Sequence, residues 1–272
     1  MNENLLNQVL WKINKALDKF LEDQDKNLNF NDNFAFIFYK NSLKPVKNFD
    51  YKPLDSLIGI DYQKEQLLKN TEKFVYGKPA NNAILWGERG TGKSTLVKSV
   101  CYEFKDKGLK IIQVLKEDIL SIFNLYEPIE KNKQYKFVIF IDDLSFQPEE
   151  KEYKEFKTII DGTIYKIPEN LLFYITSNRK NLVPIKFSDR QKDEETRISD
   201  TLEEKLSLID RFGLRLGFYE MDKNTYLKIV EFYAKKYEIQ MQTQKLHLLA
   251  MRYAREMGAL NARVALQFIK SL

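Results

Sequence analysis

Cysteine and histidine are almost absent from this sequence of 272 residues, and each scarcity excludes a class of protein. Cys101 is the only cysteine, so the chain cannot form an intrachain disulfide framework, and it suits a reducing compartment. His247 is the only histidine, which excludes a Ser-His-Asp triad and a metal site built on two or three histidines of one chain. Any chemistry must therefore rest on other side chains.

Long apolar runs are also missing, since no stretch approaches the roughly 18–20 residues that a membrane-spanning helix needs. The first residues, MNEN, lack the basic start and the apolar core of a secretory signal. We therefore expect a cytoplasmic protein with no membrane partner. The formal net charge is +5, but lysine and glutamate are interspersed, which favours a mixed solvated surface over a concentrated nucleic-acid-binding face.

The most informative stretch is WGERGTGKSTL, at residues 86–96. It matches the pattern G-x-x-x-x-G-K-[ST] at Gly87, Gly92, Lys93 and Ser94. A short apolar run at 83–86 precedes it, and a helical pattern from about Thr95 to Phe104 follows. Strand, glycine-rich turn and helix are the context that this phosphate-binding motif, the Walker A sequence, requires.

The chemistry of the motif follows from its backbone. Glycines allow successive N–H groups to face one anion, and the helix N-terminus adds about half a positive charge at the same point. We expect Lys93 to reach the β- and γ-phosphates of a nucleoside triphosphate, and the Ser94 hydroxyl to hold Mg²⁺. The loop predicted to hold the phosphates comprises Gly87, Glu88, Arg89, Gly90, Thr91, Gly92, Lys93, Ser94 and Thr95.

Beyond this loop, apolar runs alternate with helical patterns, as in a parallel α/β sheet. Strands are predicted at 34–39, 83–86, 110–115, 136–141, 171–176 and 214–219. Helices are predicted at 5–21, 62–76, 95–104, 116–126, 150–160, 201–210, 223–237, 244–257 and 262–269. Asp222 and Thr243 are the expected N-caps of two C-terminal helices, and the polar residues 186–200 are predicted to form a loop.

Carboxylates follow the almost wholly apolar strand predicted at 136–141. The carboxyl end of a buried parallel strand lies at the crevice where α/β sheets bind ligands. Asp142 is therefore expected to bind Mg²⁺, and Asp143 to orient or deprotonate the attacking water, which is the Walker B arrangement. The next strand ends in Ser177-Asn178-Arg179, where Asn178 could position the same water, with Thr176 as the second choice.

Several runs resemble AAA+ ATPases, in particular a bacterial family of single-domain AAA+ ATPases of unassigned function. They are LIGIDYQKEQLL, PANNAILWGERGTGKSTLVK, IDDLSF, YITSNRK, EEKLSLIDRFGLRLGF and ARVALQF, and the similarity extends from about Ala35 to the C-terminus. The resemblance implies an N-terminal extension (1–52, a helix and a short strand), an α/β nucleotide-binding core with a five-stranded parallel sheet (53–220) and a helical lid (221–272). It also implies ATP and Mg²⁺ as ligands and a homo-oligomeric ring or filament, but it supplies no client.

The same resemblance assigns roles outside the phosphate loop. Ile58 and Gly59 correspond to the segment that holds the adenine in AAA+ proteins, although an ordinary start of a helix would explain them too. Arg211 corresponds to an arginine that completes the site of a neighbouring subunit; a salt bridge with Asp210 or Asp200 is the alternative. Arg263 corresponds to a lid arginine that reaches the β- and γ-phosphates, unless it is merely a solvated helix residue.

The motifs leave more than one function open. Most AAA+ proteins carry Asp-Glu where this chain has Asp142-Asp143, so the reach of the shorter Asp143 to water is in doubt. A switch or loader acting on DNA or a protein partner with slow hydrolysis stays open, as does a scaffold that binds nucleotide only for stability. Guanine specificity is disfavoured because residues 132–135 (NKQY) lack the aspartate of Asn-Lys-x-Asp. Protein threading is also disfavoured, because no aromatic-hydrophobic-Gly pore loop precedes the Walker B strand.

Overall fold

The computed structural model describes residues 30–146, 151–162, 166–179 and 208–272. Its centre is a seven-stranded sheet in the order β2-β1-β4-β5-β6-β3-β7. The strands are β1 (Ala35–Tyr39), β2 (Ser42–Pro45), β3 (Ala83–Gly87), β4 (Leu109–Val114), β5 (Lys136–Ile141), β6 (Leu171–Ser177) and β7 (Leu214–Phe218). All neighbouring strands pair in parallel except β1 and β2. The helix predicted at 5–21, the loop at 186–200 and most of the helix at 201–210 lie outside the described residues.

The predicted α/β fold class is confirmed, and residues 53–220 contain five parallel strands, β3 to β7, but the whole sheet has seven strands and not five. β1 pairs in parallel with β4, and β2 folds back on β1 as a hairpin, which adds two strands at one edge. Lys40 and Asn41 both have positive φ, as the commonest two-residue hairpin turns require. The sequence of β2, SLKP, is too short and polar to be recognised, but such features suit the exposed edge of a sheet. The domain boundary at residues 52/53 stays a prediction.

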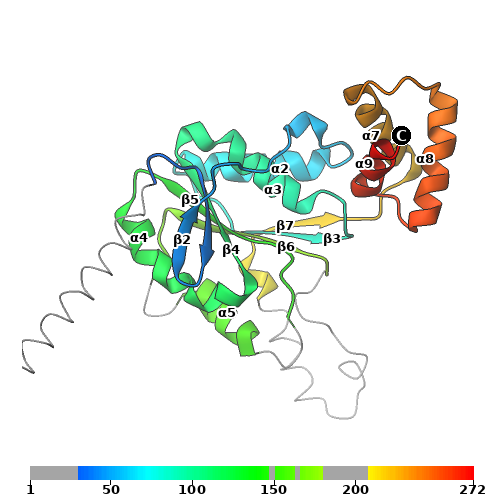
Figure 1. The fold of residues 1–272 in the computed structure, drawn as a ribbon. Helices are drawn as coiled ribbons and strands as arrows, with labels where there is room; N and C mark the ends of the chain where they lie inside the picture. Colours follow the sequence, from blue (N-terminus) through cyan, green and yellow to red (C-terminus); the bar gives the residue numbers. More distant parts are fainter. Residues whose placement is uncertain (1–29, 147–150, 163–165, 180–207) are drawn as a thin grey trace, which may run out of the picture.

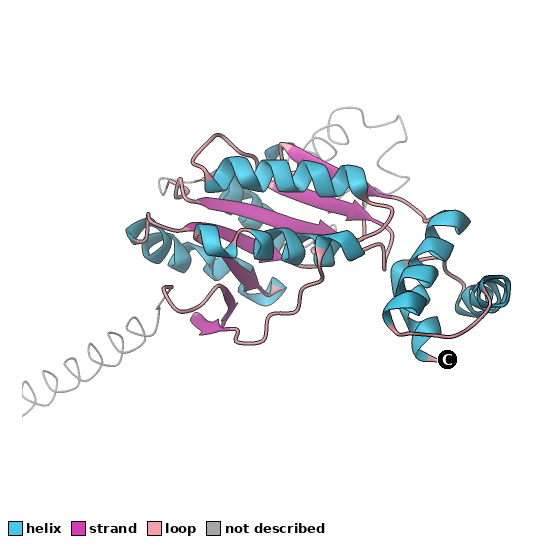
Figure 2. Ribbon diagram, turned by 90° about the horizontal axis from the view of Figure 1, so that it is seen from above, coloured by secondary structure: helices cyan, strands magenta, loops and turns pink. Residues whose placement is uncertain are grey.

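Helices cover both faces of the sheet (Figure 1). On one face lie α2 (Asp61–Val75) and α3 (Lys93–Glu103), which run side by side over the strands in Figure 2. On the other face lie the 3₁₀ segment η3 (Lys116–Leu125), α4 (Tyr126–Lys131) and α5 (Lys151–Asp161). The single short helix predicted at 116–126 is therefore replaced by a 3₁₀ segment that continues into α4. Short 3₁₀ turns also occupy Leu54–Ser56 (η1), Lys105–Lys107 (η2) and Ile209–Arg211 (η5).

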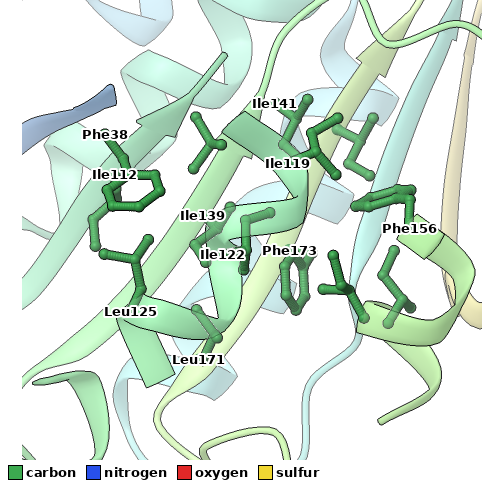
Figure 3. Packing of buried hydrophobic residues seen from close by; sticks show 14 of the residues in the cluster. Phe38, Ile112, Ile119, Ile122, Leu125, Ile139, Ile141, Phe156, Leu171 and Phe173 are labelled. Carbon is green, nitrogen blue, oxygen red and sulfur yellow. The ribbon is translucent and has the colours of Figure 1, made fainter. Parts of the chain in front are cut away.

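Two apolar clusters hold these layers together, and β5 contributes to both. Its alternate residues Phe137, Ile139 and Ile141 pack in the cluster that includes η3 and α5, much of which Figure 3 shows. Val138 and Phe140 point to the opposite face, towards α2 and α3. Because a strand's side chains alternate between faces, a strand covered on both sides reads as a continuous apolar run. This packing explains the sequence KFVIFI.

The C-terminal helices have an apolar cluster of their own and lie beyond the end of the sheet (Figures 1 and 2). They are α7 (Lys223–Lys236), α8 (Thr243–Met257) and α9 (Ala262–Lys270). Asp222 caps α7, as predicted, by accepting a hydrogen bond from the Thr225 amide. The predicted cap at Thr243 is wrong, because Gln242 precedes the first residue of α8 and makes no side-chain cap bond. None of the helices in the described part of the chain is long and apolar enough to cross a membrane.

Cys101 lies on the buried face of α3, with no exposed surface. Burial raises the pKa of its thiol and so disfavours the reactive thiolate. We expect a thiol reagent such as DTNB to leave the native protein unmodified and to react at once after denaturation. Rapid labelling of the native protein, measured by absorbance with a small free thiol as the control, would contradict this packing.

Candidate nucleotide-binding site

The loop between β3 and α3 has a backbone that only glycine adopts easily. Gly87, Gly90 and Gly92 have φ of +129°, +75° and +99°. A Cβ on Gly87 would lie 1.8 Å from the Phe218 carbonyl oxygen of β7, so no larger residue fits there. Gly92 immediately precedes α3, whose first two residues are Lys93 and Ser94. The glycines thus let the chain turn sharply from strand to helix, leaving the helix N-terminus at the mouth of the loop.

Lys93 lies at the centre of this loop and is buried. Its ammonium donates hydrogen bonds to the carbonyl oxygens of Gly87 and Glu88, both at 2.7 Å, and to Asn178 Oδ1 at 3.1 Å. Burial lowers the pKa of Lys93, while the nearby carboxylates, Asp143 first, oppose this effect by favouring the charged form. All three donors of the ammonium are thus in use, so an anion that enters the loop would have to replace one of these acceptors.

The acidic pair lies near the loop because β6 lies between β5 and β3 and runs parallel to both, with Ile141 of β5 opposite Ile175 of β6. Asp142 Oδ1 accepts hydrogen bonds from Ser94 Oγ and from Thr176 Oγ1, each at 2.5 Å. Asp143 has a positive φ of 52°, and its carboxylate accepts a hydrogen bond from Asn178 Nδ2. The structure therefore links the predicted lysine, serine, both aspartates and the asparagine in one hydrogen-bonded group.

This group lines a cavity of about 700 Å³ between the sheet and the C-terminal helices. The volume is within the usual range for ligand and cofactor sites, roughly 300–1,000 Å³. Of the predicted site residues, those that line the cavity are Ile58, Arg89, Gly90, Thr91, Gly92, Lys93, Ser94, Thr95, Asp142, Asp143, Asn178 and Arg263. Those that do not are Gly59, Gly87, Glu88 and Arg211.

Three of these four residues have other contacts at the edge of the cavity. Gly87 and Glu88 support it from behind, through the carbonyl oxygens that hold Lys93. Gly59 has a φ of +81°, and a Cβ there would lie 2.3 Å from Thr225 Cγ2 of α7. Its lack of a side chain thus permits close packing against the C-terminal helices, and the structure does not bring it to the cavity wall as the predicted base contact requires.

Arg211 lies away from the cavity, with 51% of its side chain exposed. Its guanidinium pairs with Asp161 at the end of α5, with Nε 2.6 Å and a terminal nitrogen 3.3 Å from the two carboxylate oxygens. Asp210, one of the two partners considered from the sequence, pairs with Arg215 instead. Asp200, the other, is outside the described residues. Arg211 therefore serves no role within the cavity of its own chain.

Comparison with known proteins places this chain in a protein family. A family model described as "Protein of unknown function (DUF815)" matches residues 31–272. The chain belongs to this family. The comparison with curated protein sequences found no match.

Some solved structures are similar to this chain at low sequence identity. A Thermotoga maritima RuvB T158V structure is 16% identical, with a TM-score of 0.48 over 81% of this chain and 72% of that one. Trip13 is named in a second match, the E. coli MS115-1 HORMA:CdnC:Trip13 complex, which is 12% identical with a TM-score of 0.49 over 80% of this chain and 90% of that one. These likenesses are too distant to say what a DUF815 protein does, so function has to be argued from the site.

The cavity of this DUF815 chain has polar residues that sequence reasoning missed. Lys52 Nζ donates a hydrogen bond to the Tyr233 hydroxyl of α7 at 3.0 Å, and Lys98 pairs with Asp50 at 2.6 Å. The hydrogen bond from Lys98 lowers the pKa of Asp50. All four residues line the cavity. No local signal marked them, because Asp50 and Lys52 lie in no predicted helix or strand, and Lys98 and Tyr233 lie in predicted helices with no motif around them.

The donors at the site fit Mg²⁺ together with a phosphate ligand. Mg²⁺ prefers oxygen and is usually held by one or two carboxylates together with substrate phosphates. Ser94 and Asp142 provide a hydroxyl and a carboxylate beside the helix N-terminus. Among the described residues, no group of three or more His, Cys, Asp or Glu could hold a metal ion without other ligands. Ser94 and Asp142 by themselves would leave most positions around the ion to phosphate oxygens and water.

Proposed function

We propose that this DUF815 chain is a cytoplasmic, Mg²⁺-dependent ATPase of the AAA+ type that remodels a client as a homo-oligomer. The observation that carries the proposal is the continuous hydrogen-bonded group from Lys93 through Asn178 to Asp143, and from Ser94 to Asp142. A phosphate-binding lysine, a hydroxyl and two carboxylates on one cavity wall are the parts that phosphoryl transfer to water needs.

Each residue then has a defined task. Lys93 and the amides of the loop bind the phosphates, and Ser94 and Asp142 hold the metal in place. Bound Mg²⁺ would neutralise charge on the triphosphate as the terminal bond breaks. Asp143 accepts a proton from the attacking water or orients it, with Asn178 fixing the carboxylate. Arg263 is on the cavity wall near the start of α9, where its cation can meet the phosphates.

The position of Arg211 supports the proposal of a homo-oligomer. A forked guanidinium suits the stabilisation of phosphoryl charge, yet Arg211 is exposed and remote from the cavity of its own chain. We propose that it completes the site of a neighbouring copy, in a ring or filament. The division into an extension (1–52), a nucleotide-binding core (53–220) and a lid (221–272) belongs to the same proposal.

Thermal unfolding tests the ligand. ATP with Mg²⁺ should raise the midpoint, because a ligand at 100 times its Kd stabilises the native state by about 2.7 kcal/mol. We expect a smaller rise with ATP and EDTA and none with Mg²⁺ alone, since the metal needs the phosphates. If the midpoint stays unchanged under all of these conditions, the chain does not bind ATP and the proposed function is wrong.

Turnover tests the activity, and it should be measured on samples whose oligomeric state is known from light scattering. Stabilisation by ATP without hydrolysis, in every oligomeric state, would instead indicate a nucleotide-dependent switch or a scaffold. Adding single- or double-stranded DNA across a series of salt concentrations separates a DNA-acting enzyme from the rest. Contacts with the DNA phosphates make binding steeply salt-dependent.

A further inference from the structure

The hydroxyl of Thr176 has two partners in the acidic pair. Thr176 is the penultimate residue of β6 and has only 1% of its surface exposed. Its Oγ1 donates a hydrogen bond to Asp142 Oδ1 at 2.5 Å and accepts one from the Asp143 amide at 2.9 Å. We propose that Thr176 is a positioning residue that orients both carboxylates for the metal and the water. This inference rests on the proposed ATPase site.

The backbone after β5 needs such support. Asp143 has a φ of 52°, in the left-handed region that is unfavourable for residues other than glycine. Thr176 holds the turn on both sides of this residue, because its carbonyl oxygen also accepts a hydrogen bond from the Leu144 amide at 2.8 Å. One residue of β6 thus fixes three consecutive residues of the turn, Asp142 to Leu144.

The two hydroxyls on Asp142 do different things. Ser94 Oγ and Thr176 Oγ1 both donate to Oδ1, so each restricts rotation of the same carboxylate. Ser94 is expected to turn to Mg²⁺ when the nucleotide binds, whereas Thr176 is buried at the strand end and belongs to the sheet. The hydrogen bond from Thr176 is therefore the one that still orients Asp142 in the loaded site.

The end of β6 also provides a matched control. Side chains alternate along a strand, so Thr176 and Asn178 point to the acidic pair while Ser177 between them does not. Ser177 is buried too, and its Oγ accepts a hydrogen bond from the Arg179 amide. Ser177→Ala thus removes a buried hydroxyl from the same strand without touching Asp142 or Asp143.

The test compares Thr176→Val, Thr176→Ser and Ser177→Ala with the wild type. Calorimetry measures the affinity for a slowly hydrolysed ATP analogue with Mg²⁺ and with EDTA. We expect Thr176→Val to lower the Mg²⁺-dependent gain in affinity by about 10–100-fold, the usual cost of losing a group that orients a metal ligand. Affinity in EDTA should stay unchanged, because the phosphate loop is intact. Thr176→Ser keeps the hydroxyl and should recover most of the gain, and Ser177→Ala should match the wild type.

A Thr176→Val protein that keeps the full gain from Mg²⁺ would overturn the proposal and leave the ATPase function standing. Equal losses with Mg²⁺ and with EDTA would overturn it as well, since they indicate general damage to the site. Should the wild type bind no nucleotide, the proposed function fails and this inference fails with it. Circular dichroism checks that each variant folds. If Thr176→Val does not fold, Thr176→Ala takes its place, because alanine removes the hydroxyl without adding a second methyl group in the buried site.

Discussion

An Arg211→Ala variant is expected to lower ATP turnover by roughly 10³–10⁵-fold, which is the effect of an arginine that stabilises the transition state of GTP hydrolysis in GTPases. The guanidinium pairs with Asp161 on the surface and is not part of the cavity of its own chain, so it can act only on the site of a neighbouring copy. Removing it would take away the cation that stabilises the transferred phosphoryl group there. ATP binding should stay as in the wild type, since nothing in that cavity changes. Turnover at saturating protein concentration, together with nucleotide affinity, separates the two effects. Unchanged turnover would show that no neighbouring copy uses this arginine.

Arg215→Ala is the matched control for charge and position. Arg215 is another half-exposed arginine close in sequence, and it pairs with Asp210. We expect its loss to leave turnover close to that of the wild type. Mixing Arg211→Ala with Lys93→Ala subunits sharpens the test further, because the second variant should not bind ATP but still carries Arg211. The mixture should regain turnover that neither variant shows alone, and a mixture as inactive as its components would contradict action between subunits.

Lys93→Ala should weaken ATP binding by about 10²–10⁴-fold. This is the loss expected if Lys93 donates two charge-assisted hydrogen bonds to the phosphates, each worth about 1.5–3 kcal/mol. The buried ammonium is the cation held at the centre of the loop, and its removal also takes away the hydrogen bonds that it donates to the carbonyl oxygens of Gly87 and Glu88. Titration with a fluorescent ATP analogue measures the change in affinity.

The control for Lys93→Ala is Lys107→Ala, which removes the same charge from an exposed turn after α3. It should bind the analogue as the wild type does. If both variants bind equally well, the loop between β3 and α3 does not hold the phosphates, and the proposed site is wrong.

Local signals were sufficient for most elements of this chain. The strand, loop and helix around Lys93 were predictable because an apolar run, glycines and a helical pattern each act within a few residues. The boundaries of β5 were predicted without error, since a run such as KFVIFI can be buried on both faces. Errors came where the pattern was short or polar, as in β2, or where a helical pattern formed a 3₁₀ segment, as in η3.

The candidate site divides in the same way. The residue types at the ends of β5 and β6 were predictable, because carboxylates and amides directly follow buried strands. Their partners were not. Thr176, the second choice for contact with water, holds the acidic pair by hydrogen bonds. Arg211 pairs with Asp161, which was not considered from the sequence, while Asp210 pairs with Arg215. The contact between Lys52 and Tyr233 joins residues 181 positions apart, which no nearby pattern indicates.

By itself the sequence determined the phosphate loop, the acidic pair and the alternation of strands and helices, because each depends on the conformational preferences of neighbouring residues. Only the tertiary structure decided that β6 lies between β5 and β3, so that Asn178 meets both Asp143 and Lys93. The order of strands in a sheet follows from which apolar faces pack best over the whole domain, and that balance is not contained in any one stretch of chain.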